Sequence, residues 1–331
     1  RVLADRGCRE ALALFQADAK EGGEVGITAL GQLGGPADAP LLEELATEGS
    51  KPAQAAFAEL ALRVPPANLL PRAWAQAGPS LRRQMLRRIG EGPEAHVTQD
   101  LCALLDIALT DPELAIPAQR ATLSLTSKMV PGDERTYIAR ILALAKDEGV
   151  ITRALGLAAD GPEQVELATL EPFLASENER IRRTALVALA ATPGEEIDAR
   201  LVQRLTEEED VQAKRLLVRL LRERVAAGAL DPLLALTRHA DAALARDAGN
   251  ALLTMAAKSD DEQARATYLR LVDSSLVRDA VIGLGRTGDL SVLPVLRRLL
   301  GEQRATLHDV IARAAARIGK GLLHDSADID G

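Results

Sequence analysis

The residues that could perform acid–base or metal chemistry are few in this sequence and are not grouped. None of the four histidines is followed by a glutamate, and they stand apart at His96, His239, His308 and His324. The two cysteines, Cys8 and Cys102, match no metal-binding or redox spacing. There is no glycine-rich phosphate loop and no Gly-x-Ser-x-Gly nucleophile turn. We therefore expect no catalytic residues, no metal site and no cofactor, and we predict that the protein is not an enzyme.

Acidic side chains cluster at 207–209 and 260–262, where helices are predicted to end or begin. Carboxylates at such places interact favourably with the dipole of the helix that follows. The clusters therefore indicate solvated turns rather than metal ligands.

The elements that must carry the remaining charged side chains are helices. The composition is 47% hydrophobic but only 2% aromatic, so alanine and leucine must fill the core. Both residues favour helix, and the β-branched and aromatic runs typical of strands are absent. The net charge of −8 argues against a dedicated nucleic-acid binder, because such proteins are usually basic.

One unit of the chain is clearest at 276–300, where a short helix, a Gly-Asp turn and a second helix follow one another. In the first helix, which we call the patterned helix, apolar residues stand at positions 0, 4, 5 and 8 and form one face. Position 2 is often basic or an amide. Position 9 is often glycine, which we expect to form a left-handed C-cap.

The pattern recurs ten times at intervals of 27 to 36 residues, with position 8 at Leu33, Leu60, Ile89, Leu125, Ala158, Leu189, Leu220, Leu252, Leu284 and Ile318. A second apolar helix, the intervening helix, separates one patterned helix from the next. Because one such hairpin cannot bury its apolar face alone, neighbouring hairpins must stack. We predict a capping helix or partial repeat at 1–23, stacked hairpins over 24–319 and an acidic tail at 320–331.

The strings VRDAVIGLGRTGD and VLPVLRRLL in this unit, with IRRTALVALA from Ile181 and ITALGQLG from Ile27, resemble the HEAT-repeat family. They are most similar to the bacterial phycobilisome-lyase-type HEAT-like repeats. The resemblance implies an all-α, right-handed α-solenoid of about ten stacked helical hairpins. It also implies that the second helix of each hairpin, here the patterned helix, lines the concave face.

The segment 63–79 departs from the pattern because it contains four prolines, which shorten or break the intervening helix. The chain's single tryptophan, Trp74, lies within it. Trp74 is either packed at an irregular joint of the solenoid or exposed as an aromatic anchor for a partner.

Charge is sorted between the two kinds of helix. The patterned helices with their caps sum to about +13, whereas the intervening helices and turns sum to about −18. Positions 2, 3, 6 and 7 face away from the core and carry the candidate partner-binding cations Arg83, Arg87, Arg120, Arg153, Arg183, Lys214, Arg215, Arg219, Arg246 and Arg278. Position 6 is often small, which predicts a shallow groove beside Gly31, Ala58, Gly156 and Ala316.

Two interpretations of these cations stay open. The arginines at position 2 either form a ladder with acidic turn residues of neighbouring repeats or line a basic wall. Asn178, Asp241 and Asp273 each lie five residues before such an arginine, where they are also suited to cap a helix. The groups 82–88 and 214–224 contain more positive charge than their local turns can pair, which favours a wall that attracts acidic segments or nucleic-acid backbones.

The leading expectation is a protein–protein interaction scaffold whose concave face binds a partner, with an acidic segment as the fitting ligand. The alternative is nucleic-acid binding by the same wall, as in helical-repeat DNA glycosylases. A bilin lyase-like subunit is a further alternative, suggested only by the repeat subtype. No apolar run reaches the roughly 18 residues that span a bilayer, and no signal peptide is visible, so we expect a cytoplasmic protein without membrane contact. The first residue, Arg1, suggests a processed chain or a piece of a longer one.

Overall fold

The fold of the chain, obtained as a computed structural model, is built from α-helices joined by short turns. The structure describes residues 9–64, 69–91, 97–130, 132–161, 165–302 and 305–325, and within them it contains no strand. Two compact units, 1–181 and 182–331, divide the chain.

All ten patterned helices are present, and each contains its predicted residue at position 8. They are α2 (Glu24–Leu33), α4 (Lys51–Arg63), α6 (Pro79–Glu91), α8 (Ala115–Leu125), α10 (Glu148–Asp160), α12 (Glu179–Ala191), α14 (Val211–Arg224), α16 (Ala242–Lys258), α18 (Val277–Thr287) and α20 (Ala305–Asp325). The predicted all-helical fold is confirmed.

The intervening helices alternate with them along the described chain. They are α3 (Ala39–Thr47), α5 (Leu69–Gln76), α7 (Gln99–Thr110), α9 (Asp133–Leu144), α11 (Leu167–Leu174), α13 (Glu195–Glu207), α15 (Leu230–Leu236), α17 (Asp261–Leu271) and α19 (Leu293–Gly301), while α1 (Arg9–Lys20) precedes the first hairpin. Short 3₁₀ turns stand at Pro36–Asp38, Thr126–Lys128, Ala227–Ala229 and Leu290–Val292.

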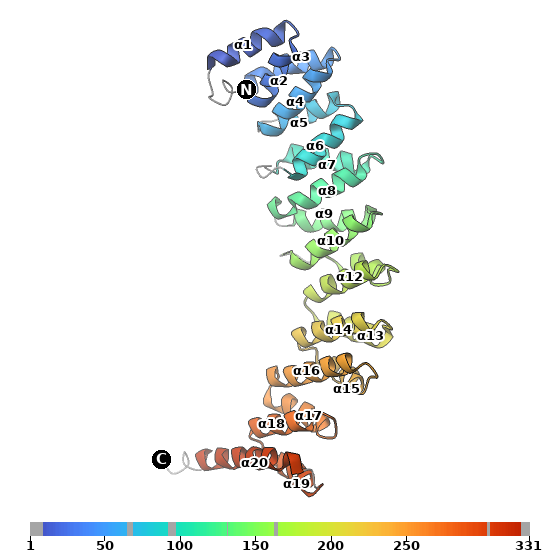
Figure 1. The fold of residues 1–331 in the computed structure, drawn as a ribbon, viewed down its shortest axis with the longest axis vertical. Helices are drawn as coiled ribbons and strands as arrows, with labels where there is room; N and C mark the ends of the chain where they lie inside the picture. The colour runs from blue at the N-terminus through green and yellow to red at the C-terminus, as the bar shows by residue number, and fades with distance from the viewer. Residues whose placement is uncertain are drawn as a thin grey trace. The chain divides into compact units, whose positions relative to one another are not determined.

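Patterned helices pack on one another in each unit, as in an all-α solenoid (Figure 1). In unit 1, α1 packs on α2, α2 on α4, and α6 on α8; in unit 2, α14 packs on α16 and α18 on α20. The core between them is made of alanine and leucine. In α18, for example, Ala280, Val281 and Leu284 are fully buried, in agreement with the predicted face.

The glycine at position 9 has a different role from the one predicted. Gly90 and Gly285 lie inside their helices, and the left-handed C-cap of α18 is Gly288, with a φ of 68°. A Cβ on Gly285 would lie 2.8 Å from the Cα of Ala314 in α20, and one on Gly90 would lie 3.1 Å from the Cα of Ala121 in α8. These glycines therefore allow two patterned helices to approach closely.

The register of two repeats also differs from the prediction. In α2, Val25 was assigned to the core face but is 73% exposed, whereas Leu30 is fully buried. Gly31 packs against Ala56 of α4 as Gly285 packs against Ala314. Gly31 therefore occupies position 9, and the pattern of the first repeat begins three residues earlier than predicted. In α14, Leu217 and Leu221 are fully buried, which shifts that repeat one residue later.

Helix caps were predicted correctly where the carboxylate or amide stands close to the first turn. The side chain of Asp241 accepts a hydrogen bond from Leu244 N at 2.8 Å, and Asn178 accepts one from Arg180 N at 2.9 Å. Asp273 was predicted to cap α18 but does not, because that helix begins only at Val277.

The ends of the chain are described only in part. Helix α20 continues to Asp325, so the predicted acidic tail at 320–331 begins as helix, and 326–331 lie outside the described residues. Residues 1–8 of the predicted N-terminal cap, with Cys8, and also His96, lie outside them too. Among the helices of the described chain, none is long and apolar enough to cross a membrane.

Candidate partner-binding surface

Several of the candidate cations form the rungs of a ladder. Each rung joins a patterned helix to an acidic residue just before or within the next patterned helix. The pairs are Arg83–Glu113 at 3.7 Å, Arg120–Asp147 at 3.6 Å, Arg183–Asp210 at 3.7 Å and Arg215–Asp247 at 2.7 Å. Asp147 and Asp210 also cap the helices that they precede.

The rungs are exposed and therefore weak. The side chains of Arg83 and Glu113 are 53% and 67% exposed, and pairs of this kind contribute about 0–1 kcal/mol each. The hydrogen bond to Asp247 raises the pKa of the Arg215 guanidinium. The ladder orders side chains between repeats more than it stabilises the fold.

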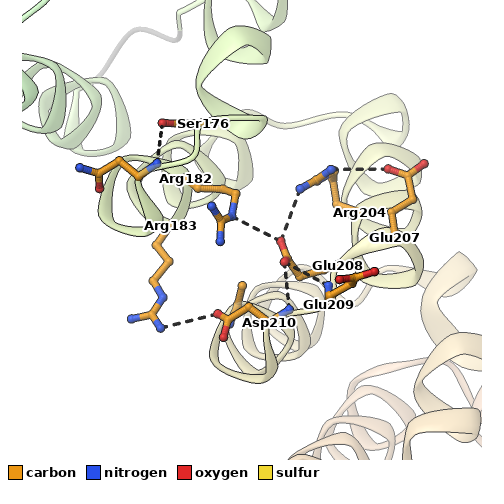
Figure 2. A network of polar contacts seen from close by, with 10 residues as sticks. Ser176, Arg182, Arg183, Arg204, Glu207, Glu208, Glu209 and Asp210 are labelled. Atoms are coloured by element: carbon orange, nitrogen blue, oxygen red, sulfur yellow. Dashed lines mark hydrogen bonds and ion pairs between the residues drawn. The ribbon is translucent and has the colours of Figure 1, made fainter.

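One acidic residue of unit 2 is held much more firmly than the rungs. Glu208, between α13 and α14, is 8% exposed and accepts hydrogen bonds from the backbone N–H groups of Glu209 and Asp210. Arg204 approaches its carboxylate to 3.4 Å and Arg182 to 3.8 Å (Figure 2). This network fixes the turn that presents Asp210 to Arg183.

Most cations of the two dense basic groups, 82–88 and 214–224, have hydrogen-bond or ion-pair partners within the fold. Arg224 donates to the backbone oxygens of Ala190 and Thr192, each at 2.7 Å, and also pairs with Asp198. It therefore caps the end of α12 instead of facing a partner.

The first dense group is occupied in the same way. Arg88 pairs with Glu59 of α4 at 2.7 Å. Arg82 lies 5.3 Å from the centre of the Trp74 ring, and its Nε donates to the Trp74 carbonyl at 3.2 Å. These partners lie on other helices, whereas the sequence comparison considered only the acidic residues of the local turns.

Trp74 is packed, so the alternative of an exposed aromatic anchor is wrong. Its side chain belongs to α5 and is only 6% exposed. Arg82 covers the ring and gains from a cation–π contact. We therefore remove Trp74 from the candidate partner-binding residues.

Five candidate cations make no ion pair or hydrogen bond with their side chains in the described part of the chain: Arg87, Lys214, Arg219, Arg246 and Arg278. All but Lys214, which is half-buried, are exposed. The last candidate, Arg153, donates to the hydroxyl of Ser124 at 3.1 Å. The structure therefore divides the predicted basic wall into four structural rungs, Arg153 with its hydroxyl partner, and five cations without a side-chain partner among the described residues.

A groove of about 290 Å³ lies across three successive patterned helices of unit 1. Each helix contributes a strip of residues three or four apart: α2 the residues Thr28 and Gln32, α4 the strip from Pro52 to Leu62, and α6 the residues Leu81, Gln84, Met85 and Arg88. Ala58, at position 6, lines it as predicted. Gly31 was also predicted to lie beside a groove, but it is buried against Ala56.

Sequence reasoning missed the glutamines of this groove. Nothing local distinguishes Gln32 and Gln84 from other polar residues on helices, and they line one groove only because α2, α4 and α6 pack together.

The residues suited to metal chemistry stay apart in the fold. Among the described residues, no group of three or more His, Cys, Asp or Glu side chains could hold a metal ion. The ring of His239 accepts a hydrogen bond from Asp241 N at 3.0 Å, which gives it a local role in the turn before α16.

No protein-family model and no curated protein matches the chain. Two crystal structures of engineered proteins from the Northeast Structural Genomics Consortium resemble it. One is 20% identical with a TM-score of 0.38, over 84% of this chain and 88% of that one. The other is 18% identical with a TM-score of 0.24, over 85% and 97%. At such TM-scores neither informs the arrangement of this chain, which is an all-α repeat protein by its own helices.

Proposed function

We propose that this chain is a non-enzymatic scaffold that binds an acidic segment of a partner protein along the solvent-facing side of its patterned helices. The observation that carries the proposal is the pair Arg246 and Arg278, which lie on the consecutive patterned helices α16 and α18. Both are exposed, and neither has a side-chain partner among the described residues. Asp247, the acid beside Arg246, is already held by Arg215.

Unpaired surface cations attract anionic ligands because bringing a carboxylate to them breaks no existing pair. Arg87 on α6 offers the same property in unit 1. The resemblance to HEAT-like repeats also supports a role as a scaffold, and membership of that family stays a prediction.

The test compares two triple variants of the full chain. R87E/R246E/R278E reverses cations of patterned helices, and K146E/R238E/R297E reverses exposed cations outside them; none of the six has a side-chain partner among the described residues. The probe is a fluorescent nine-residue peptide of three Glu-Ser-Val repeats, measured by anisotropy at about 0.1 M salt, where the screening length is about 10 Å. We expect at least about a tenfold weaker Kd for the first variant and less than about a twofold change for the control.

Equal losses in the two variants would show that only net charge matters and would overturn the proposal. The binding of duplex DNA that carries the same fluorescent label is measured in parallel. Binding of the DNA without binding of the peptide would instead support the nucleic-acid alternative, whose contacts are also electrostatic.

A further inference from the structure

The groove across α2, α4 and α6 has features that the unpaired arginines alone do not explain. Its floor is formed by small or aliphatic side chains of α4, among them Ala55 and Ala58. Gln32 of α2 and Gln84 of α6 line the groove on the two helices that pack on α4. Both glutamines are exposed, and their side chains make no hydrogen bond within the residues that the structure describes.

A carboxamide offers one acceptor and two donors, which is also what is needed to pair with the C=O and N–H of a peptide bond. Two such groups on the flanking helices, with a smooth floor between them, suit a chain whose backbone polar groups are free. An extended segment leaves these groups free, whereas a helix uses them internally.

The spacing of the helices suits the same ligand. Packed helices lie about 8–10 Å apart. Roughly three residues of an extended strand, at about 3.3 Å each, cover one helix-to-helix step.

The charges in and beside the groove indicate which kind of peptide segment it would bind. Inside the groove, Glu59 and Arg88 neutralise each other at 2.7 Å, so the floor accepts backbone and uncharged side chains. On α6 next to Gln84 stand Arg83 and Arg87, both exposed, and Arg87 has no side-chain partner among the described residues. An acidic side chain that leaves the groove on this side meets positive charge.

We infer that the groove over α2, α4 and α6 binds the backbone of an acidic segment of a partner protein in extended conformation, with Gln32 and Gln84 pairing to its peptide groups and Arg87 to a carboxylate. This inference rests on the proposed function, since it assigns a conformation and a set of contacts to the same class of ligand.

The test uses the full chain carrying R246E/R278E, which reverses the two cations of unit 2 on which the proposed function rests. Ala55→Leu is added to fill the groove, and Ala143→Leu, at an exposed alanine of α9, is the matched control. We expect at least about a fivefold weaker Kd for Ala55→Leu and no change for the control. Gln32→Ala combined with Gln84→Ala, which leaves the groove open, is expected to weaken binding in the same direction.

A second arm replaces the peptide by one with N-methylated valines, which cannot donate from those backbone positions. We expect it to bind several-fold more weakly. If the peptide binds the R246E/R278E chain and its Kd changes neither with Ala55→Leu nor with N-methylation, the inference is overturned while the proposed function stands. If it binds wild type but not the R246E/R278E chain, the groove is not a site. If it fails to bind wild type at all, the proposed function itself falls.

Discussion

At the scale of single residues, arginines of similar sequence context have three different fates. Arg183 pairs with the cap of the next helix, Arg224 is drawn in to carbonyl groups at the end of α12, and Arg278 stays unpaired. Position 2 was predictable from the pattern. The partner was not, because it depends on acids contributed by other helices.

We expect the fold of unit 2 to be sensitive to the loss of the Glu208 carboxylate. Glu208→Ala leaves Arg182 and Arg204 without a shared carboxylate and two backbone N–H groups without their acceptor. Breaking a buried pair of this kind costs about 3 kcal/mol. Urea denaturation of the full chain measures the loss.

The control is the exposed neighbour, Glu209→Ala, which is expected to change the unfolding free energy by less than about 0.5 kcal/mol. Losses of similar size in the two variants would show that the network adds no stability of its own.

At the scale of helices, the glycines of the patterned helices set how closely two helices pack. Gly285→Ala places a Cβ within 2.8 Å of Ala314, so α18 and α20 must separate. Gly156→Ala, in the interior of α10, meets no atom within 4 Å and gains helix propensity. We expect Gly285→Ala to be less stable than Gly156→Ala by at least about 2 kcal/mol, measured by thermal or urea unfolding.

Equal stabilities would mean that the α18–α20 contact adapts at no cost. This feature illustrates a limit of sequence reasoning at the element scale. The Leu-Gly ending was recognised, but a glycine near a helix end has two common uses, a left-handed cap and a close contact. Only the position of Ala314 decides between them.

At the scale of the whole molecule, the ladder and the proposed binding surface respond differently to salt. The rungs are exposed, so screening them costs little stability. Raising NaCl from about 0.1 M to about 1 M shortens the screening length to about 3 Å and is expected to abolish peptide binding while shifting Tm by only a few degrees.

Circular dichroism for Tm and anisotropy for binding provide the two measurements on the same samples. A fall in Tm of more than about 10 °C at high salt would show that the ladder carries much of the stability. Peptide binding that is unchanged at high salt would contradict a contact made through Arg87, Arg246 and Arg278.

The sequence by itself determined the class of the fold, the ten patterned helices and the N-terminal caps Asn178 and Asp241. It could do so because the apolar spacing and the residues that accept N–H groups at a helix start act within one helix. Tertiary structure decided the packing of Trp74, the role of Gly285, the register of α2 and which arginines stay unpaired. Each of these depends on atoms from another helix, as Trp74 depends on Arg82 and Gly285 on Ala314, and the approach of the two helices is set by their packing and not by local sequence.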